Sequence, residues 1–184
     1  MIESKSDYKE YFREDLRATG LKKDLITILF DRRYKFYKYL RLAEYYTNCK
    51  NGFFAKLMRF RYKLLCDRYM WTIPINVFGK GLQLVHYGPI VVSYKAKIGD
   101  YARVHVGVNI GWAPSHGIDG TPVIGNRCYF GPGAKLFGPI VLGDNICIGA
   151  NSVVNKSFES NCTIAGVPAR KISDNTSISY ISIE

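Results

Sequence analysis

Residues 124–154, IGNRCYFGPGAKLFGPIVLGDNICIGANSVV, repeat with a period of six. An apolar side chain occupies every sixth position, at Ile124, Phe130, Leu136, Leu142, Ile148 and Val154. The same step is present upstream, at Val92, Ile98, Val104 and Ile110. A period of six, with glycine following most of the apolar residues, is typical of a parallel β-helix, in which each repeat forms one short strand and one turn. Such rungs bury their apolar faces only against their neighbours, so the pattern predicts a solenoid.

A second inward position lies four residues after each periodic aliphatic. It holds small or apolar side chains, including Leu82, Ala102, Val108, Cys128, Ala134, Ile140, Ile146 and Ser152. A narrow, close-packed interior requires such residues. An earlier frame at Phe78, Leu84 and Ile90 is two residues out of step with Val92. The pattern therefore predicts a bulge within residues 86–91.

The first seventy residues have a different character. They hold 17 Lys and Arg against 9 Asp and Glu, so most of the chain's net charge of +11 lies there. Gly20 predicts the end of a short first helix, and the Asn51-Gly52 pair separates a second helix over about 22–47 from a third over 53–69. We predict a basic α-helical region at 1–70, a β-helix at 71–173 and a tail at 174–184.

The basic, tyrosine-rich helices leave three interpretations open. Lys and Arg interleaved with aromatics can bind nucleic acid, although charge alone is a weak signal and nucleic acid is not our first choice. The positive face can instead attract an anionic acceptor, such as an acidic glycan or a lipid-linked phosphate, at the membrane periphery. In the third interpretation the helices simply pack against the solenoid.

Composition restricts the cellular setting. No stretch reaches the length of a transmembrane helix and the N-terminus is charged, so we expect a cytoplasmic protein. The five cysteines are odd in number and form no Cys-x-x-Cys pair. They are expected to be reduced packing residues, with no metal site.

Three segments resemble the hexapeptide-repeat acyltransferases. Inside that family, they are most similar to the serine acetyltransferase-like branch. They are residues 85–92 (VHYGPIVV), 124–138 and 164–170 (IAGVPAR), and the likeness covers about 70–173. The resemblance implies a left-handed β-helix and a homotrimer, with acetyl-CoA as acetyl donor in the groove between neighbouring subunits. Fold class is thus mainly β with an α-helical N-terminal region.

The chemistry so implied is attack of a hydroxyl on a thioester, which needs a general base and a donor to the oxyanion. A neutral imidazole is available near pH 7, and His86 matches the family's catalytic histidine. His105 is expected to point outward from a rung near the same groove. His116 falls in the irregular segment 112–122, which interrupts the period and is expected to help shape the site.

The resemblance also implies roles for other positions. Backbone N–H groups at Gly111 and Trp112 correspond to the oxyanion donors, and the Trp112 ring can pack on the acceptor or on pantetheine. Acetyl-CoA contacts fall on Pro132 and Ala150, with Arg170 and Lys171 near the 3′-phosphate.

Two departures from serine acetyltransferases stand out. The aspartate that orients the family's catalytic histidine is missing, since the corresponding stretch is Thr72-Ile73-Pro74-Ile75. A backbone carbonyl, Tyr87 or Asn76 is expected to hold the ring instead, at some loss of basicity. The family's second histidine is missing from residues 120–124. The overall pattern more closely resembles the O-acetyltransferases found with capsule or exopolysaccharide synthesis. This resemblance implies an O-acetyltransferase acting by direct transfer in a ternary complex on a sugar hydroxyl of a surface-polysaccharide precursor. The alternatives are L-serine as acceptor, as in cysteine biosynthesis, and a non-catalytic binding or scaffold module.

Overall fold

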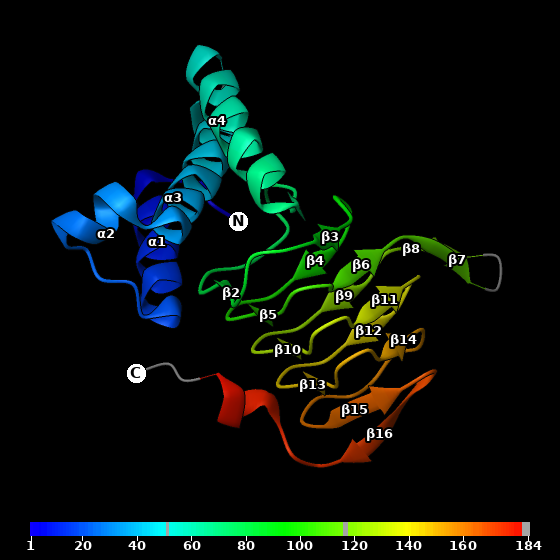
Figure 1. Ribbon diagram of the computed structural model, residues 1–184. Helices are drawn as coiled ribbons and strands as arrows, with labels where there is room; N and C mark the ends of the chain where they lie inside the picture. Colours follow the sequence, from blue (N-terminus) through cyan, green and yellow to red (C-terminus); the bar gives the residue numbers. More distant parts are fainter. Residues whose placement is uncertain (51, 116–117, 182–184) are drawn as a thin grey trace.

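The computed structural model describes residues 1–50, 52–115 and 118–181. Its N-terminal part contains α1 (Lys5–Thr19), α2 (Leu25–Phe30), α3 (Arg32–Tyr45) with a π-helical extension (Tyr46–Lys50), and α4 (Phe53–Tyr69). These helices lie together at one end of a β-helix. Residues 163–173 lie at the other end, and the chain then turns back along the coil, where the Tyr180 carbonyl accepts from Arg103 (Figure 1). No helix within the described ranges is long and apolar enough to cross a bilayer.

The helix boundaries follow from local capping. The Ser4 side chain accepts from the backbone N–H of Asp7 to begin α1, and Gly20 ends it in the left-handed conformation, as predicted. The predicted helix over 22–47 is wrong in one respect, because it divides at Asp31. This residue is extended, and its carboxylate accepts from the N–H groups of Arg33 and Tyr34, so it ends α2 and caps α3. The third helix begins and ends where the sequence predicts.

The second part of the chain winds through three parallel sheets. Sheet 1 contains β1 (Trp71–Thr72), β3 (Ile90–Val92), β6 (Asn109–Gly111), β11 (Lys135–Phe137) and β14 (Val153–Val154). Sheet 2 contains β2 (Gln83–Leu84), β5 (Arg103–Val104), β10 (Tyr129–Phe130), β13 (Cys147–Ile148), β15 (Thr163–Gly166) and the antiparallel β16 (Ala169–Ser173). Sheet 3 contains β4 (Lys97–Ile98), β9 (Val123–Ile124) and β12 (Val141–Leu142).

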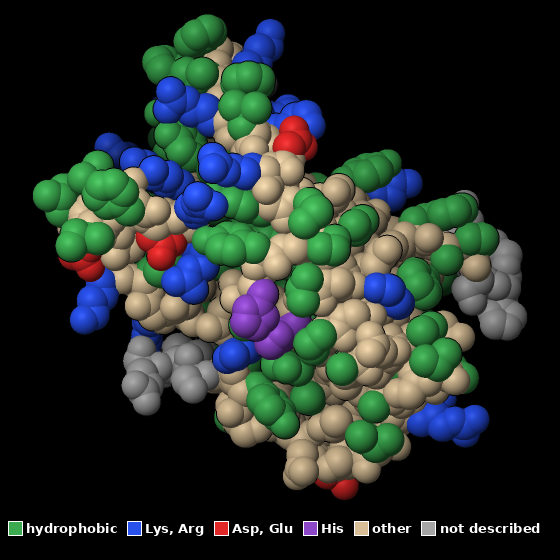
Figure 2. Space-filling model, viewed as in Figure 1, with side chains coloured by type: hydrophobic (Ala, Val, Ile, Leu, Met, Phe, Trp, Pro, Cys, Tyr) green, Lys and Arg blue, Asp and Glu red, His purple; other side chains and the backbone are tan. Residues whose placement is uncertain are grey.

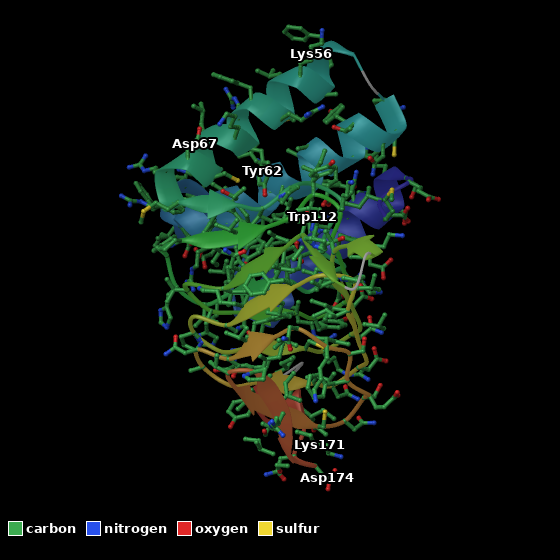
Figure 3. All side chains as sticks on the ribbon, turned by 90° about the vertical axis from the view of Figure 1, so that its right-hand side faces the viewer. Lys56, Tyr62, Asp67, Trp112, Lys171 and Asp174 are labelled. Carbon is green, nitrogen blue, oxygen red and sulfur yellow. The ribbon has the colours of Figure 1, made fainter. Side chains whose placement is uncertain are left out.

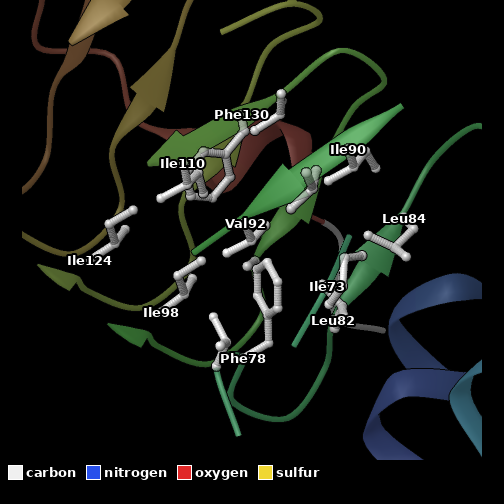
Figure 4. Packing of buried hydrophobic residues seen from close by; sticks show 14 of the residues in the cluster. Ile73, Phe78, Leu82, Leu84, Ile90, Val92, Ile98, Ile110, Ile124 and Phe130 are labelled. Atoms are coloured by element: carbon white, nitrogen blue, oxygen red, sulfur yellow. The ribbon is translucent and has the colours of Figure 1, made fainter. Parts of the chain in front are cut away.

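The periodic aliphatics fill the interior of this coil (Figure 4). Val104, Ile110, Phe130, Leu136 and Ile148 are completely buried. The second inward positions are buried as well, among them Ala134, Ile146 and Ser152. All five cysteines are free, and Cys128 is an inward packing residue as predicted. The six-residue period therefore sets which side chains face the core.

The predicted bulge is present. Strand β3 pairs with β6 through partners 18 residues apart, Val91 and Asn109, whereas β2 pairs with β5 through Gln83 and Arg103, 20 residues apart. The two extra residues lie between Leu84 and Val91, where the chain bends at 86–88. Gly88 has a φ of 130°, a conformation that favours glycine.

A short antiparallel hairpin interrupts the coil after β6. It is formed by β7 (Ala113–Ser115) and β8 (Ile118–Gly120), and it projects from the side of the β-helix in Figure 1. The coil then resumes at β9 in register with β4. The six-residue period is interrupted here because the hairpin residues project out of the coil. The strands before and after the hairpin keep their alignment with the neighbouring coils.

One buried arginine joins the helices to the β-helix. Arg41 of α3 is fully buried and donates to both carboxylate oxygens of Asp15, at 2.7 and 3.0 Å, and to Glu44 at 2.9 Å. It also donates to the backbone carbonyls of Phe78 and Gly79. Burial alone lowers the pKa of Arg41, but the carboxylates of Asp15 and Glu44 outweigh it and raise the pKa. The guanidinium therefore stays charged inside this network.

The glycines at the corners leave no space for a side chain, which gives a testable prediction. A Cβ on Gly125 would lie 2.8 Å from the backbone C and O of Gly143 and would contact Asp144 Oδ1. We expect Gly125→Ala to lower the free energy of unfolding by about 1–3 kcal/mol, because backbone on the next coil must move. Urea denaturation measures the change. Gly111→Ala is the matched control, since its Cβ meets nothing nearer than 3.6 Å, and equal stability losses for the two variants would contradict the prediction.

Candidate active site

The strands of sheet 2 leave the sheet at a common edge of the β-helix. Their last inward residues are in register, namely Leu84, Val104, Phe130, Ile148 and Ile164. Two residues further along each coil, the chain reaches His86, Val106, Pro132, Ala150 and Gly166. We call this row the corner edge. Backbone bonds from Gly133 N–H to the Val106 carbonyl, and from Asn151 N–H to the Pro132 carbonyl, tie successive coils together along it.

The corner edge brings three predicted site residues onto one line. His86 lies at its upper end beside the bend, and Pro132 and Ala150 follow on lower coils. All three are exposed, as is Gly166 at the lower end. Because consecutive coils of parallel strands are about 4.8 Å apart, an extended molecule can follow the edge from His86 to Gly166. The sequence had placed these residues on separate rungs without aligning them.

A second histidine lies beside the first. The ring centroids of His86 and His105 are 5.9 Å apart with an interplanar angle of 62°, and the two histidines form one patch in Figure 2. His105 also contacts the ring of Tyr129 at 5.1 Å, which in turn lies 4.8 Å from Tyr180. His105 thus lies on the outside of its rung, next to the inward residue Val104, and is half-buried because it packs against His86 and Tyr129.

The surroundings of His105 favour its neutral form. Burial, then the charge of Arg103, then His86 lower the pKa of this imidazole. Its Nε2 atom is buried and has no hydrogen-bond partner among the described residues. His105 consequently adds no positive charge next to His86 near pH 7, and the His86 ring remains open to solvent on its other side.

The proposed substitutes for the missing aspartate lie elsewhere. The Asn76 backbone N–H donates to Glu44, and its side chain exchanges hydrogen bonds with Asn48, both in the helical region. The Tyr87 ring stacks on Trp71 and contacts Tyr69. Within the described part of the chain, no side chain hydrogen-bonds the His86 ring. Neither Asn76 nor Tyr87 is therefore seen to orient it.

The predicted oxyanion donors lie on a different edge. Gly111 ends β6 and Trp112 follows it, whereas His86 precedes β3, so the two groups flank opposite sides of sheet 1. Trp112 is 52% exposed and lies on the face shown in Figure 3. One copy of the chain therefore does not bring Gly111 and Trp112 to His86. His116 lies outside the described residues.

The two basic residues of the closing segment lie at the lower end of the β-helix. Arg170 in β16 is paired with Ala165, the residue before Gly166 on the corner edge. Lys171 forms an exposed ion pair with Asp174 at 2.5 Å, far from Lys56 on α4 (Figure 3). Arg170 thus lies beside the end of the edge, while the charge of Lys171 is partly compensated.

Sequence reasoning missed two neighbours of the histidines. Arg103 donates from Nη1 to the Tyr180 carbonyl at 2.7 Å, and Tyr129 packs on His105. Both occupy the outward position just before the periodic aliphatic. Because their strands follow the His86 coil in sheet 2, residues at this outward position could have been predicted to lie near His86.

Three parallel sheets built from six-residue rungs define a hexapeptide-repeat β-helix. In this chain an exposed histidine lies on one edge of that β-helix. Residues 121–156 match the family described as bacterial transferase hexapeptide (six repeats). A serine acetyltransferase of Synechococcus elongatus is 36% identical over 94 residues, which cover 51% of this chain and 38% of that protein. One of Mycobacterium tuberculosis is 34% identical over 99 residues, 54% of this chain and 43% of that protein. This chain therefore spans less than half the length of these relatives.

Solved structures of serine acetyltransferases are similar to this chain over a larger part of its length. A serine acetyltransferase from Brucella abortus strain S19 superposes with a TM-score of 0.70 at 27% identity, over 93% of this chain and 71% of that one. The soybean enzyme gives a TM-score of 0.72 at 24% identity, over 91% and 69%. The predicted left-handed β-helix with an α-helical N-terminal region is confirmed. Residues 121–156 thus match the hexapeptide-repeat transferases, and the chain is similar to serine acetyltransferases in sequence and in fold.

The comparisons also correct one prediction. The sugar hydroxyl of a surface-polysaccharide precursor is wrong as the expected acceptor, because the relatives at 34–36% identity and the structural neighbours are serine acetyltransferases. The error arose from giving the missing aspartate and second histidine more weight than the likeness of the whole β-helix. The matches favour the alternative, in which the acceptor is L-serine.

Proposed function

We propose that this protein is an acetyl-CoA-dependent serine O-acetyltransferase, with His86 as general base. The observation that carries the proposal is the corner edge, which joins an exposed histidine to an open track past Pro132 and Ala150. The similarity to serine acetyltransferases supports the choice of acceptor.

In this mechanism the acceptor hydroxyl lies against the His86 imidazole. The ring removes the hydroxyl proton as the oxygen attacks the thioester carbonyl, and then returns a proton to the departing CoA sulfur. Transfer is direct, so both substrates are bound together. The neutral form of His105 favours proton uptake by His86 during the reaction, because a cationic neighbour would oppose it.

Acetyl-CoA supplies the activated acetyl group, and the corner edge has features that suit it. Its exposed residues, Pro132, Ala150 and Gly166, present small side chains and backbone to an extended ligand. Pro132 lacks an N–H, and its carbonyl already accepts from Asn151, so it can offer van der Waals contact and a spare lone pair. Arg170, beside the lower end, provides positive charge for a phosphate.

The proposal includes a homotrimer. Gly111 and Trp112 lie on the edge of sheet 1 opposite to His86. A neighbouring copy, rotated about an axis along the β-helix, can present that edge to His86 and complete the site with backbone donors. The hairpin formed by β7 and β8 would then project over the neighbour. Sedimentation that gives the mass of a single chain would oppose this arrangement.

The direct test is release of CoA thiol from acetyl-CoA in the presence of L-serine, with O-acetylserine identified by mass. We expect serine-dependent release and none with L-alanine, which lacks only the hydroxyl. Release that ignores serine would contradict the proposal. Failure to bind acetyl-CoA at all would instead favour the non-catalytic module.

A further inference from the structure

Helix α4 carries apolar side chains on two opposite faces. The inner row is buried and consists of Ala55, Tyr62, Cys66 and Tyr69. The outer row consists of Phe53, Leu57, Phe60 and Leu64, at the i, i+4, i+7 and i+11 spacing of one helix face. The two rows are offset by two residues, about 200° around the helix, so the outer row points away from the core. Phe53, Phe60 and Leu64 are accordingly 73%, 60% and 52% exposed, and packing of α4 on this protein does not explain them.

Basic side chains flank the outer row on both sides. With 3.6 residues per turn, Lys56 and Lys63 lie along one side of it. Arg61 and Arg68 lie along the other side, and all four side chains are exposed. Helix α4 as a whole carries five Lys and Arg against a single acid. An apolar row bordered by Lys and Arg is typical of a helix that lies in the interface of a lipid bilayer.

A second group of exposed apolar side chains belongs to α2. None of its six residues is buried. Half or more of the surface is exposed at Leu25, Ile26, Leu29 and Phe30. Basic pairs border this helix in the chain, at 22–23 and at 32–33. On the face shown in Figure 2, apolar side chains gather over α2 and over α4, with Lys and Arg side chains between them. The helical region therefore presents two apolar projections joined by a basic surface.

A cavity beside the outer row has the charge to accept a phosphate. Its volume is about 660 Å³, and its wall includes Arg59, Phe60, Lys63 and Tyr94. Lys63 pairs with Asp67, whereas Arg59 has no acidic partner among the residues that the structure describes. Phe60 belongs both to this wall and to the outer row, so a molecule with an apolar tail and an anionic head can contact both. Basic recesses next to a membrane surface bind lipid head groups.

We propose that α2 and the outer row of α4 bind this protein to the surface of an anionic phospholipid bilayer. Phe53, Phe60 and Leu64 enter the boundary between head groups and acyl chains, and the flanking Lys and Arg contact lipid phosphates. Helix α4 projects from the end of the molecule away from β16 in both Figure 1 and Figure 3, as binding to a flat surface requires. Membrane binding of this kind is independent of acetyl transfer.

Charge and shape argue against two other occupants of this surface. If α4 packed on the same helix of a second copy, its five cations would meet five more, and like charges across an interface oppose association. Nucleic acid uses cations, and single strands also stack on aromatic rings, but neither contact needs Leu64 or the apolar side chains of α2. A bilayer contacts the apolar and the basic side chains together.

The test is co-sedimentation with vesicles of phosphatidylcholine alone, or with about 30% phosphatidylglycerol, at about 0.1 M and about 0.5 M NaCl. At the lower salt concentration we expect at least about tenfold stronger binding to the anionic vesicles, because each Lys or Arg near the surface adds to the attraction. The higher salt concentration should remove most of this preference, since it screens the charges.

Matched variants separate the apolar row from the charge. Phe60→Gln should weaken binding to anionic vesicles about fivefold or more, because a large apolar side chain no longer enters the interface. Ile172→Gln is the control, because Ile172 is 64% exposed, close to the 60% of Phe60, and lies in β16 at the other end of the molecule. It should bind as the unmodified protein does. The double variant Lys56→Gln, Arg59→Gln should lower the preference for anionic vesicles to about threefold or less. These side chains are all exposed, so the melting temperatures should match.

Equal binding to the two kinds of vesicle, or binding that Phe60→Gln leaves unchanged, overturns the inference. An assembly in lipid-free solution that Phe60→Gln disrupts, with no binding to vesicles, also overturns it, because the outer row is then an interface between copies. Salt-sensitive binding to nucleic acid without binding to vesicles overturns it in favour of a polyanion. None of these results affects the proposed acetyl transfer, which is measured separately by release of CoA thiol.

Discussion

Replacing His86 with alanine is expected to lower kcat/KM for acetyl transfer to serine by about two to four powers of ten. A positioned general base contributes an effect of this size, because the neutral hydroxyl is a weak nucleophile without it. His86 is exposed and makes no hydrogen bond within the described residues, so its loss should leave the fold intact. The rate should fall mainly through kcat. Initial rates of CoA thiol release measure the effect.

Two controls make the result specific to the base. The melting temperature and the affinity for acetyl-CoA should match those of the unmodified protein, since alanine removes only a surface ring. Added imidazole should restore part of the rate, because it can occupy the vacated space and accept the proton. If the variant keeps more than about a tenth of the activity, His86 is not the general base.

Replacing Arg41 with methionine is expected to lower the free energy of unfolding by about 3–5 kcal/mol. The substitution removes one partner of a buried network and leaves the carboxylates of Asp15 and Glu44 without their cation. It also leaves the carbonyls of Phe78 and Gly79 without this donor, at the junction between helices and β-helix. For a chain of this length the loss corresponds to a fall in melting temperature of about 6–20 °C.

Thermal denaturation of the variant at fixed protein concentration tests this expectation. Lys63→Met is the matched control, because it breaks an ion pair with Asp67 in which both side chains are more than half exposed. We expect that control to change stability by about 0.5 kcal/mol or less. Similar losses for the two variants would show that the Arg41 network contributes no more than a surface pair.

Periodic features of the fold could be predicted with good accuracy. The six-residue step predicted the coil, its inward side chains and the bulge next to His86, because strand, turn and burial repeat with the sequence. Gly20 and the Asn51-Gly52 pair marked helix ends because capping is local. The division of the second helix at Asp31 was missed, since its aromatic pattern continues across the break.

The spatial arrangement of the candidate site was harder to predict from the sequence. His86 could be singled out by its place in the bulge and by its resemblance to a catalytic residue. Its alignment with Pro132 and Ala150 depends on how many residues each coil contains, and the hairpin insertion changes that number between β5 and β10. Asn76 was considered as a partner of His86 and lies instead with Asn48 and Glu44.

The sequence by itself determined the β-helix and its inward face, because those properties repeat at short range along the chain. It also singled out His86, through the break in that period and the resemblance to a catalytic histidine. Only the tertiary structure placed His105 against His86 and buried Arg41 beneath residues 78 and 79. These contacts join residues far apart in the chain through packing of the helices on the coil. No local period records such packing, because it depends on shape and charge across two separately formed surfaces.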